Sequence, residues 1–175
     1  VTDIDELAAK LRMLRDWGQS ERYRHVVRGF NYRMDAVQAA VLDVKLRHLD
    51  GWTAGRRAVA AAYDRRLAVR GIGRARAAGS EHVWHVYAIQ AAERDAVRRK
   101  LADAGVATGI HYPVPVHLQP AYSDLGYGPG DLPVSERLAR EFLSLPIYPE
   151  LASDQIAYVC DALEDAVVGE SADVA

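Results

Sequence analysis

The sequence predicts an α/β fold built from helices and a covered sheet. Half of its 175 residues are apolar, which is enough for a packed core. From residue 82 onward the apolar pattern indicates strand, helix, strand, loop, helix and helix in that order. Apart from one loop, residues 1–70 show helical periodicity, and their apolar stripes need a sheet that this part of the sequence does not supply.

The chain opens with a predicted amphipathic helix and a loop. Thr2 or Asp3 can cap the helix, which should end near residues 17–18. Residues 16–29 are polar, mixed in charge and without periodicity, which indicates a loop. The apolar residues that recur at helical spacing are Ile4, Leu7, Ala8, Leu11 and Leu14.

Two further helices are expected between residues 35 and 67. Asp35 and Gln38 have the spacing of a capping box, in which each side chain accepts a backbone N–H near the other residue. Gly51 should interrupt the first of these helices, and Thr53 should cap the second. Their apolar stripes contain Met34, Val37, Val41, Val44, Val59, Ala62, Tyr63 and Leu67.

A sheet is expected in the middle of the chain. Residues 82–90 have apolar groups on both faces, which predicts a central strand in a covered sheet. A helix over residues 93–104 should end at Gly105, where left-handed backbone geometry is needed. Residues 106–112 predict a second strand, and the prolines that follow cannot continue a ladder.

The last third of the chain predicts two helices. The first opens at residues 131–133, with a proline inside its first turn, and should run to about Ser144. Residues 145–149 form a short extended link, and Ser153 should cap the final helix. Cys160 lies on the apolar stripe of that helix, so we interpret it as a small core residue.

Composition excludes several classes of protein. A formal net charge of -2 argues against binding to nucleic acid or anionic lipid by bulk electrostatics. No apolar run approaches the roughly 20 residues that a membrane span needs. One cysteine cannot form an intramolecular disulfide, so we expect a cytoplasmic protein. The histidines, including His82 and His85, show no zinc-like spacing, and no metal site is expected.

Several segments, in order along nearly the whole chain, resemble the DegT/DnrJ/EryC1/StrS aminotransferases. They are residues 11–18 (LRMLRDWG), 29–35 (GFNYRMD), 38–42 (QAAVL), 111–113 (HYP), 117–122 (HLQPAY), 131–133 (DLP) with Glu136, and 145–151 (LPIYPEL). The resemblance implies a fold type I transferase that uses pyridoxal 5'-phosphate (PLP). It also implies a homodimer with shared active sites, a nucleotide-linked keto-sugar as substrate, and glutamate or glutamine as amino donor.

The resemblance assigns a place in such an enzyme to each part of the chain. Residues 1–70 would be the end of the large PLP-binding domain with its long interdomain helices, and residues 71–81 would be a linker. Residues 82–168 would be the small C-terminal α/β domain, followed by a frayed tail at 169–175. Because the chain starts inside a helical pattern, we expect a piece of a longer polypeptide.

Two residues of the GFNYRMD segment are implied to bind ligands. Asn31 resembles the residue that reaches across the dimer to the cofactor phosphate, a task that suits an amide donor. Arg33 resembles the residue that approaches the sugar or its acidic substituent, which a guanidinium can bind through two parallel hydrogen bonds. The alternative is a helix-entry turn held by the asparagine together with a surface ion pair.

Three residues of the later segments are implied to line the mouth of the active site. His111 and Tyr112 resemble residues that hydrogen-bond the sugar, and the alternative is a strand end with a polar rim. His117 is equally well interpreted as a residue that lines the site or as one that anchors the loop.

No catalytic residue is assigned within this chain. By resemblance the Schiff-base lysine lies upstream of Val1, and Lys10, Lys45 and Lys100 lie among charged neighbours on predicted helices. The chain alone should therefore be inactive. Two alternatives stay open: a PLP-dependent deoxysugar dehydratase of the same fold, with histidine in place of the lysine, and a non-catalytic sensor or binding module.

Overall fold

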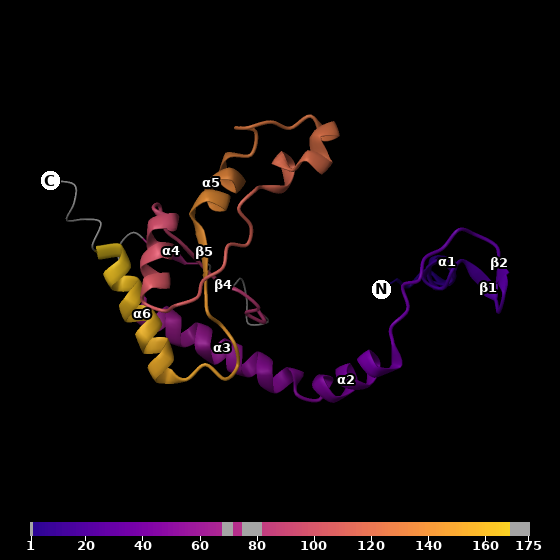
Figure 1. Cartoon of the computed structure of the whole chain (residues 1–175), viewed down its shortest axis with the longest axis horizontal. Coiled ribbons are helices and arrows are strands. Elements are labelled where there is room, and N and C mark those ends of the chain that lie inside the picture. The colour runs from indigo at the N-terminus through magenta and orange to yellow at the C-terminus, as the bar shows by residue number, and fades with distance from the viewer. Residues whose placement is uncertain (1, 68–71, 75–81, 169–175) are drawn as a thin grey trace. The chain divides into compact units, whose positions relative to one another are not determined.

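A computed structural model describes residues 2–67, 72–74 and 82–168 (Figure 1). The chain forms two compact units, Val1–His48 and Leu49–Ala175. Within the described residues, no helix is both long enough and apolar enough to cross a membrane.

The first unit begins with the predicted helix, α1 (Asp5–Arg15). The hydroxyl of Thr2 accepts a hydrogen bond from the backbone N–H of Ile4 at 3.2 Å, which stabilises the turn just before the helix starts. The predicted loop over residues 16–29 is wrong in part, because it contains a short antiparallel hairpin of β1 (Gln19–Glu21) and β2 (Arg24–His25). These strands are too short for the period of two to be visible in the sequence.

Two glycines close this hairpin at its base. Gly18 has φ +73°, and a Cβ atom built on it would lie 1.8 Å from the carbonyl oxygen of Val27. A Cβ built on Gly29 would lie 2.1 Å from the backbone nitrogen of Gly18. Only glycine permits the two backbones to approach this closely.

The second helix of this unit, α2 (Ala36–Leu46), starts at the predicted capping box. The backbone N–H of Asp35 donates to the side-chain carbonyl of Gln38 at 3.4 Å, which confirms that prediction. None of the residues of α2 is buried in this structure. Its apolar stripe is exposed, with Val37 at 76%, Val41 at 53% and Val44 at 55%.

The second unit begins with α3 (Leu49–Arg66), and here the predicted helix boundaries are wrong. Gly51 and Thr53 both lie inside α3, and the break from α2 falls at residues 47–48. Because Val59, Ala60, Tyr63 and Leu67 are buried in the core of the second unit, α3 belongs to that unit. The compact units divide the chain after residue 48, and the domain limits expected from the sequence stay a prediction; most of the expected linker, residues 71–81, lies outside the described residues.

A three-stranded antiparallel sheet forms the centre of this unit, in the order β3 (Gly73–Arg74), β4 (Tyr87–Gln90) and β5 (Phe142–Leu145). The predicted strand at 82–90 is shorter than expected but central. The predicted strand at 106–112 is wrong, since within it only Gly109 pairs, in an isolated bridge with Ser144. β5 was expected as a helix end and link, because a short apolar run is ambiguous between strand and helix.

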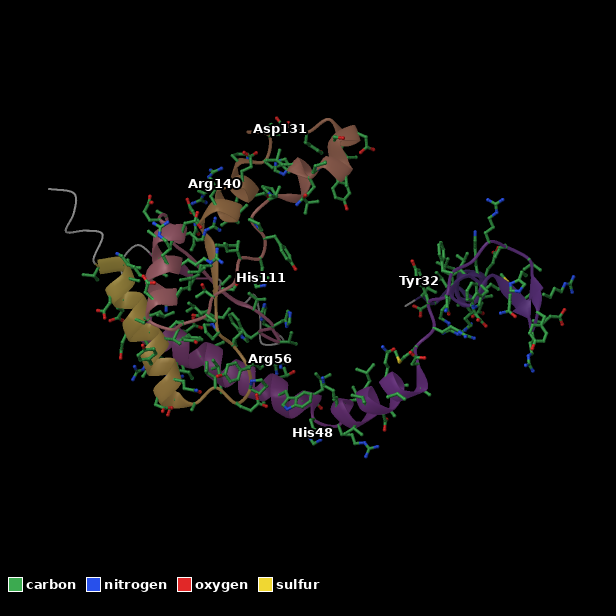
Figure 2. The ribbon with its side chains drawn as sticks, in the orientation of Figure 1. Tyr32, His48, Arg56, His111, Asp131 and Arg140 are labelled. Carbon is green, nitrogen blue, oxygen red and sulfur yellow. The ribbon has the colours of Figure 1, made fainter. Side chains whose placement is uncertain are left out.

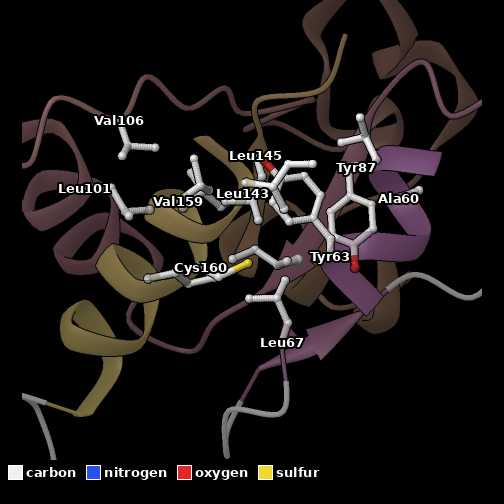
Figure 3. Packing of buried hydrophobic residues seen from close by; sticks show 14 of the residues in the cluster. Ala60, Tyr63, Leu67, Tyr87, Leu101, Val106, Leu143, Leu145, Val159 and Cys160 are labelled. Carbon is white, nitrogen blue, oxygen red and sulfur yellow. The ribbon is translucent and has the colours of Figure 1, made fainter. Parts of the chain in front are cut away.

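Three helices pack on the sheet through one apolar cluster. α3, α4 (Arg94–Asp103) and α6 (Ser153–Val168) contribute its helical residues (Figure 3). Its most deeply buried large side chains are Tyr63, Leu67, Tyr87, Ile89, Val97, Leu101, Leu143, Cys160 and Leu163. Cys160 is 1% exposed, which confirms it as a core residue. Burial raises the pKa of its thiol to about 11.

The helix ends agree with the sequence in some places and differ in others. Gly105 ends α4 with φ +75°, as predicted. α5 (Pro133–Glu141) has its proline at the first position but stops before β5, three residues earlier than expected. Ser153 is the first residue of α6 and not its cap, because the preceding Ala152 donates its N–H to Gln155 at 3.0 Å.

A long connection joins α4 to α5. It carries two short 3₁₀ helices, η1 (Val116–Leu118) and η2 (Pro120–Leu125). All of the implied site residues of the second unit lie on this connection.

Candidate functional site

The predicted site residues lie in both units of the chain. Asn31 and Arg33 belong to the first unit, between the hairpin and α2. His111, Tyr112 and His117 belong to the second unit, between α4 and α5.

Asn31 is held by its backbone and presents its side chain to solvent. It forms an antiparallel bridge with Asp16, and its neighbour Tyr32 donates a backbone hydrogen bond to Arg15 at 2.9 Å. Phe30 likewise donates to Leu14 at 2.7 Å, so the segment runs alongside the end of α1. Among the hydrogen bonds of the described residues, none involves the Asn31 side chain. Its amide is therefore available to a ligand.

Arg33 forms an ion pair with Asp16, which the sequence left open as an alternative. The guanidinium Nη1 lies 3.4 Å from Oδ1 of Asp16, with the two side chains 59% and 37% exposed. That oxygen is itself buried and has no hydrogen-bond partner among the described residues, so the contact is electrostatic only. An exposed pair of this kind contributes about 0–1 kcal/mol, which leaves the guanidinium free to bind an anion at little cost.

Beside Arg33 the surface of the first unit is hollowed. The depression has a volume of about 450 Å³ and is lined by Asp16, Gln19, Ser20, Glu21, Arg22, Tyr23 and Arg33. The guanidinium of Arg22 lies 4.8 Å from the centre of the Tyr23 ring. Charged groups of both signs line the depression, so it offers donors and acceptors to a polar ligand.

His111 lies against the edge of the sheet, while Tyr112 is largely exposed. The Nδ1 atom of His111 is 2.9 Å from Oγ of Ser144 on β5. Tyr112 is 74% exposed, and its ring meets that of His111 edge to face at 5.5 Å. The peptide bond between the two residues is cis. Both rings are placed to contact a ligand that approaches from solvent.

His117 is buried and bound to the start of α5. It is 7% exposed, and its Nε2 atom lies 3.2 Å from Oε1 of Glu136. The same carboxylate oxygen accepts backbone N–H groups from Gly130 at 2.8 Å and Leu132 at 3.4 Å. The Gly130 hydrogen bond, followed by that from His117, holds the pKa of Glu136 below its ordinary value. This geometry favours the loop-anchor interpretation of His117.

The three lysines all lie on exposed helix surface. Lys100 donates to the carbonyl oxygen of Ala166 at 2.9 Å, near the end of α6. No group of three or more potential metal ligands occurs in the parts of the chain that the structure describes.

Sequence reasoning missed two residues that contact the site residues. The local pattern places Asp16 in a loop, although it forms a backbone bridge with Asn31 and an ion pair with Arg33. Ser144 was placed at a helix end, but it is a buried polar residue between Leu143 and Leu145. A single hydroxyl inside an apolar run is the signal that could have identified it.

Another hollow of the second unit is separate from these residues. It measures about 490 Å³ and lies at the start of α6, with Gly105, Val106, Pro146, Tyr148, Asp154 and Tyr158 among its lining residues. None of the predicted site residues lines it.

Comparison with known proteins relates nearly all of the chain to one family. The sequence profile of the DegT/DnrJ/EryC1/StrS aminotransferase family matches residues 1–164. The erythromycin biosynthesis sensory transduction protein EryC1 of Saccharopolyspora erythraea is 48% identical over 166 residues, which are 94% of this chain and 45% of that protein. The dTDP-3-amino-3,4,6-trideoxy-alpha-D-glucose transaminase of Streptomyces venezuelae is 45% identical over 167 residues, covering 94% of this chain and 44% of that protein.

A solved structure shows the same fold. The crystal structure of DesV from S. venezuelae in complex with a ketimine intermediate matches with a TM-score of 0.87 and 45% identity. The match covers 94% of this chain and 45% of that one. The chain thus spans just under half the length of the relatives that it resembles.

Proposed function

Because this chain belongs to the DegT/DnrJ/EryC1/StrS aminotransferase family, whose members use PLP, we propose that it is part of a sugar aminotransferase. The proposed reaction moves an amino group from glutamate or glutamine to the keto group of a nucleotide-linked sugar. The observation that carries this proposal is the 45% identity to a dTDP-amino-sugar transaminase over 94% of the chain.

The residues of the first unit suit the cofactor's phosphate. Asn31 offers amide donors, and its backbone is fixed by the bridge with Asp16 and by the hydrogen bonds of its two neighbours to the end of α1. We propose that Asn31 binds the phosphate of PLP held by the other protomer of a homodimer. When bound, PLP acts as an electron sink for the carbon that gains or loses the amino group.

The residues of the second unit suit the sugar. In the proposed enzyme His111 and Tyr112 donate or accept hydrogen bonds at the sugar hydroxyls. Arg33, from the first unit, binds an acidic group of the nucleotide-sugar. His117, buried against Glu136, orders the loop that carries the first two. The group that forms a covalent bond to the cofactor is not among these residues, so the chain alone is expected not to turn over.

The site assignment can be tested on a full-length protein that contains this chain. Replacing Asn31→Ala should lower PLP retention, because the phosphate loses an amide donor, and the absorbance of the purified enzyme at the cofactor's visible band reports this. Tyr32→Phe is the matched control, since Tyr32 is the exposed neighbour and has no proposed contact. Unchanged PLP occupancy in Asn31→Ala would remove that residue from the site.

The activity can be tested in the reverse direction with a defined probe. The amino sugar named for the S. venezuelae relative, dTDP-3-amino-3,4,6-trideoxy-alpha-D-glucose, is mixed with 2-oxoglutarate and the full-length protein, and glutamate formation is measured. Glutamate should appear with the full-length protein and not with the 175-residue chain. Turnover by the chain alone would contradict the proposed inactivity.

A second candidate function, a sensor or binding module, is favoured by the name of one relative. The 48% identical relative is called a sensory transduction protein. Such a module would bind a nucleotide-sugar without transferring its amino group. Isothermal titration of the same dTDP-amino sugar separates the two, because binding without glutamate formation by the full-length protein favours the sensor. The dehydratase alternative depends on whether lysine or histidine stands at the cofactor.

The remaining expectations about partners are also proposals. Cytoplasmic location and the absence of nucleic-acid or membrane partners rest on the net charge of -2 and the single cysteine. Sedimentation of the full-length protein would test the homodimer.

A further inference from the structure

We propose that Ser144 and Gly109 are positioning residues that hold the imidazole of His111 in one orientation for ligand binding. Ser144 ties the ring through its hydroxyl, and Gly109 leaves the space that the ring occupies. The inference deepens the proposed function, because it rests on His111 contacting the sugar.

The backbone first brings the three residues together. Gly109 and Ser144 form an isolated antiparallel bridge in which each N–H donates to the other residue's carbonyl oxygen, at 3.0 and 2.8 Å. His111 follows two residues after Gly109, and Figure 2 shows it where this segment passes beside β5. The bridge thereby fixes the position of the His111 backbone relative to the sheet.

The hydroxyl of Ser144 lies on the sheet face opposite to the core. Leu143 and Leu145, 0% and 3% exposed, flank it and belong to the apolar cluster. Because side chains alternate along a strand, Ser144 points away from that cluster. Ser144 pairs with Ala88 on β4 and with Gly109 in the isolated bridge, so a small residue flanks it on each side. This row of small residues leaves room for an imidazole.

The ring fills that room. Nδ1 of His111 lies 2.9 Å from the Ser144 hydroxyl, which is itself on a residue only 7% exposed. A Cβ atom built on Gly109 would lie 2.7 Å from Cε1 of the ring, closer than a real contact allows. Although His111 is an exposed residue, its ring therefore has a hydrogen-bond partner on β5 and lies against the backbone of Gly109.

The consequence for binding is that the second ring nitrogen, Nε2, is held in one direction, where a ligand can reach it. The bond to Ser144 engages Nδ1, so Nε2 is the nitrogen available to a ligand in either tautomer. A tethered ring loses little rotamer freedom when the ligand arrives, whereas an untethered exposed histidine must be ordered at that moment. Loss of the tether should thus weaken ground-state binding of the sugar more than it slows the chemical step.

Two variants remove the arrangement by different physical routes. Ser144→Ala deletes the hydrogen-bond partner, and Gly109→Ala pushes the ring away by steric contact. In the full-length enzyme, with dTDP-3-amino-3,4,6-trideoxy-alpha-D-glucose and 2-oxoglutarate as probes, each should raise KM for the amino sugar by roughly 3- to 10-fold, with a smaller change in kcat. Ser123→Ala, an exposed serine on η2, is the matched control and should leave KM unchanged.

A double-mutant cycle shows whether both residues act through His111. His111→Ala should raise KM, and adding Ser144→Ala or Gly109→Ala to it should cause no further rise. If Ser144→Ala keeps its full effect in the His111→Ala background, the role is merely structural and the inference is wrong. If His111→Ala leaves KM unchanged, the inference is also overturned.

A spectroscopic measurement tests the same inference without depending on enzyme activity. The ¹⁵N resonances of the His111 ring, assigned by their loss in His111→Ala, should shift in both Ser144→Ala and Gly109→Ala and stay in place in Ser123→Ala. Unchanged His111 resonances in Ser144→Ala would overturn the tether. If the wild-type enzyme does not act on the probe sugar, the substrate part of the proposed function fails, and the resonances alone then decide for or against the tether.

Discussion

Two buried tyrosines connect α3 to the rest of the second unit through their hydroxyl groups. Tyr63 donates to the carbonyl oxygen of Pro146 at 2.8 Å, and Tyr87 donates to Oδ1 of Asp64 at 2.8 Å. Their rings lie 4.9 Å apart in a tilted pair. Burial raises the pKa of both phenols, which favours the protonated, donating form of each.

Replacing Tyr63→Phe should lower the free energy of unfolding by about 1–3 kcal/mol, because the Pro146 carbonyl loses its donor inside the protein. The measurement is urea-induced unfolding of the purified protein. Tyr122→Phe is the control, since Tyr122 is 46% exposed, and it should change stability by less than about 0.5 kcal/mol. Equal stability of the Tyr63→Phe variant and the wild type would show that the hydrogen bond contributes nothing net.

At the residue level, local chemistry was predictable and long-range contacts were not. The capping box of Asp35 and Gln38 and the burial of Cys160 follow from spacing of a few residues, and both predictions are confirmed. The contact of His111 with Ser144 joins residues 33 positions apart, which no local pattern reveals. The roles of Asn31, Arg33, His111 and Tyr112 toward ligands stay predictions.

At the level of elements, the start of α5 depends on one carboxylate. Glu136 accepts hydrogen bonds from the backbone of Gly130 and Leu132 and from the ring of His117. It thereby links η1, in the middle of the long connection, to the first turn of α5. Asp131 adds a second tie by accepting the N–H of Gly128 at 2.7 Å.

The lowered pKa of Glu136 predicts how this connection responds to acid. The folded-state pKa lies below the ordinary value of 4.5, so the stabilisation is fully present above pH 4.5 and is lost as pH falls through the folded-state pKa. Hydrogen exchange of residues 116–136 should therefore accelerate below pH 4.5 more than exchange in α6 does. In Glu136→Gln that excess acceleration should disappear, with exchange already faster at pH 7.

Glu150→Gln serves as the control for this experiment, because Glu150 is exposed in a turn. It should keep the acid response of the wild type. A Glu136→Gln variant with the same acid response as Glu150→Gln would show that other groups govern the connection.

The sequence identified most helices of the second unit and only part of its sheet. Long amphipathic helices repeat their signal over many residues, so α4 and α6 were predicted almost at their true limits. β5 has four residues, FLSL, and its assignment depends on pairing with β4. The segment 106–112 has an apolar composition but pairs at only one residue, because it soon leaves the sheet edge for the connection.

On the scale of the whole molecule, exposed large apolar side chains occur in both units of the described chain and are more closely spaced along the first unit. The sequence predicted unpaired apolar stripes over residues 34–67, yet α3 buries its own stripe in the second unit. Residues 30–46 keep several large apolar side chains exposed, among them Phe30 at 53%, Met34 at 61% and Val37 at 76%. Exposed apolar side chains repeated along one short segment promote association.

We therefore predict that the isolated 175-residue chain self-associates with increasing concentration. Changing Val37→Glu together with Val41→Glu should shift the chain toward monomer in sedimentation velocity, because charges replace one ridge of α2. Val134→Glu, a single exposed apolar residue of α5 in the second unit, is the control and should leave the association unchanged. A wild-type chain that stays monomeric at every concentration would contradict the prediction.

The narrow base of the hairpin has a consequence for how this protein can be changed. Since the backbones of residues 18 and 29 are in close contact, the two ends of the segment 19–28 lie next to each other. A longer or shorter segment between the two glycines can therefore be accommodated without moving residue 31. Protein engineers could thus exchange this ten-residue cassette, or splice a peptide tag into it, provided that both flanking glycines are retained.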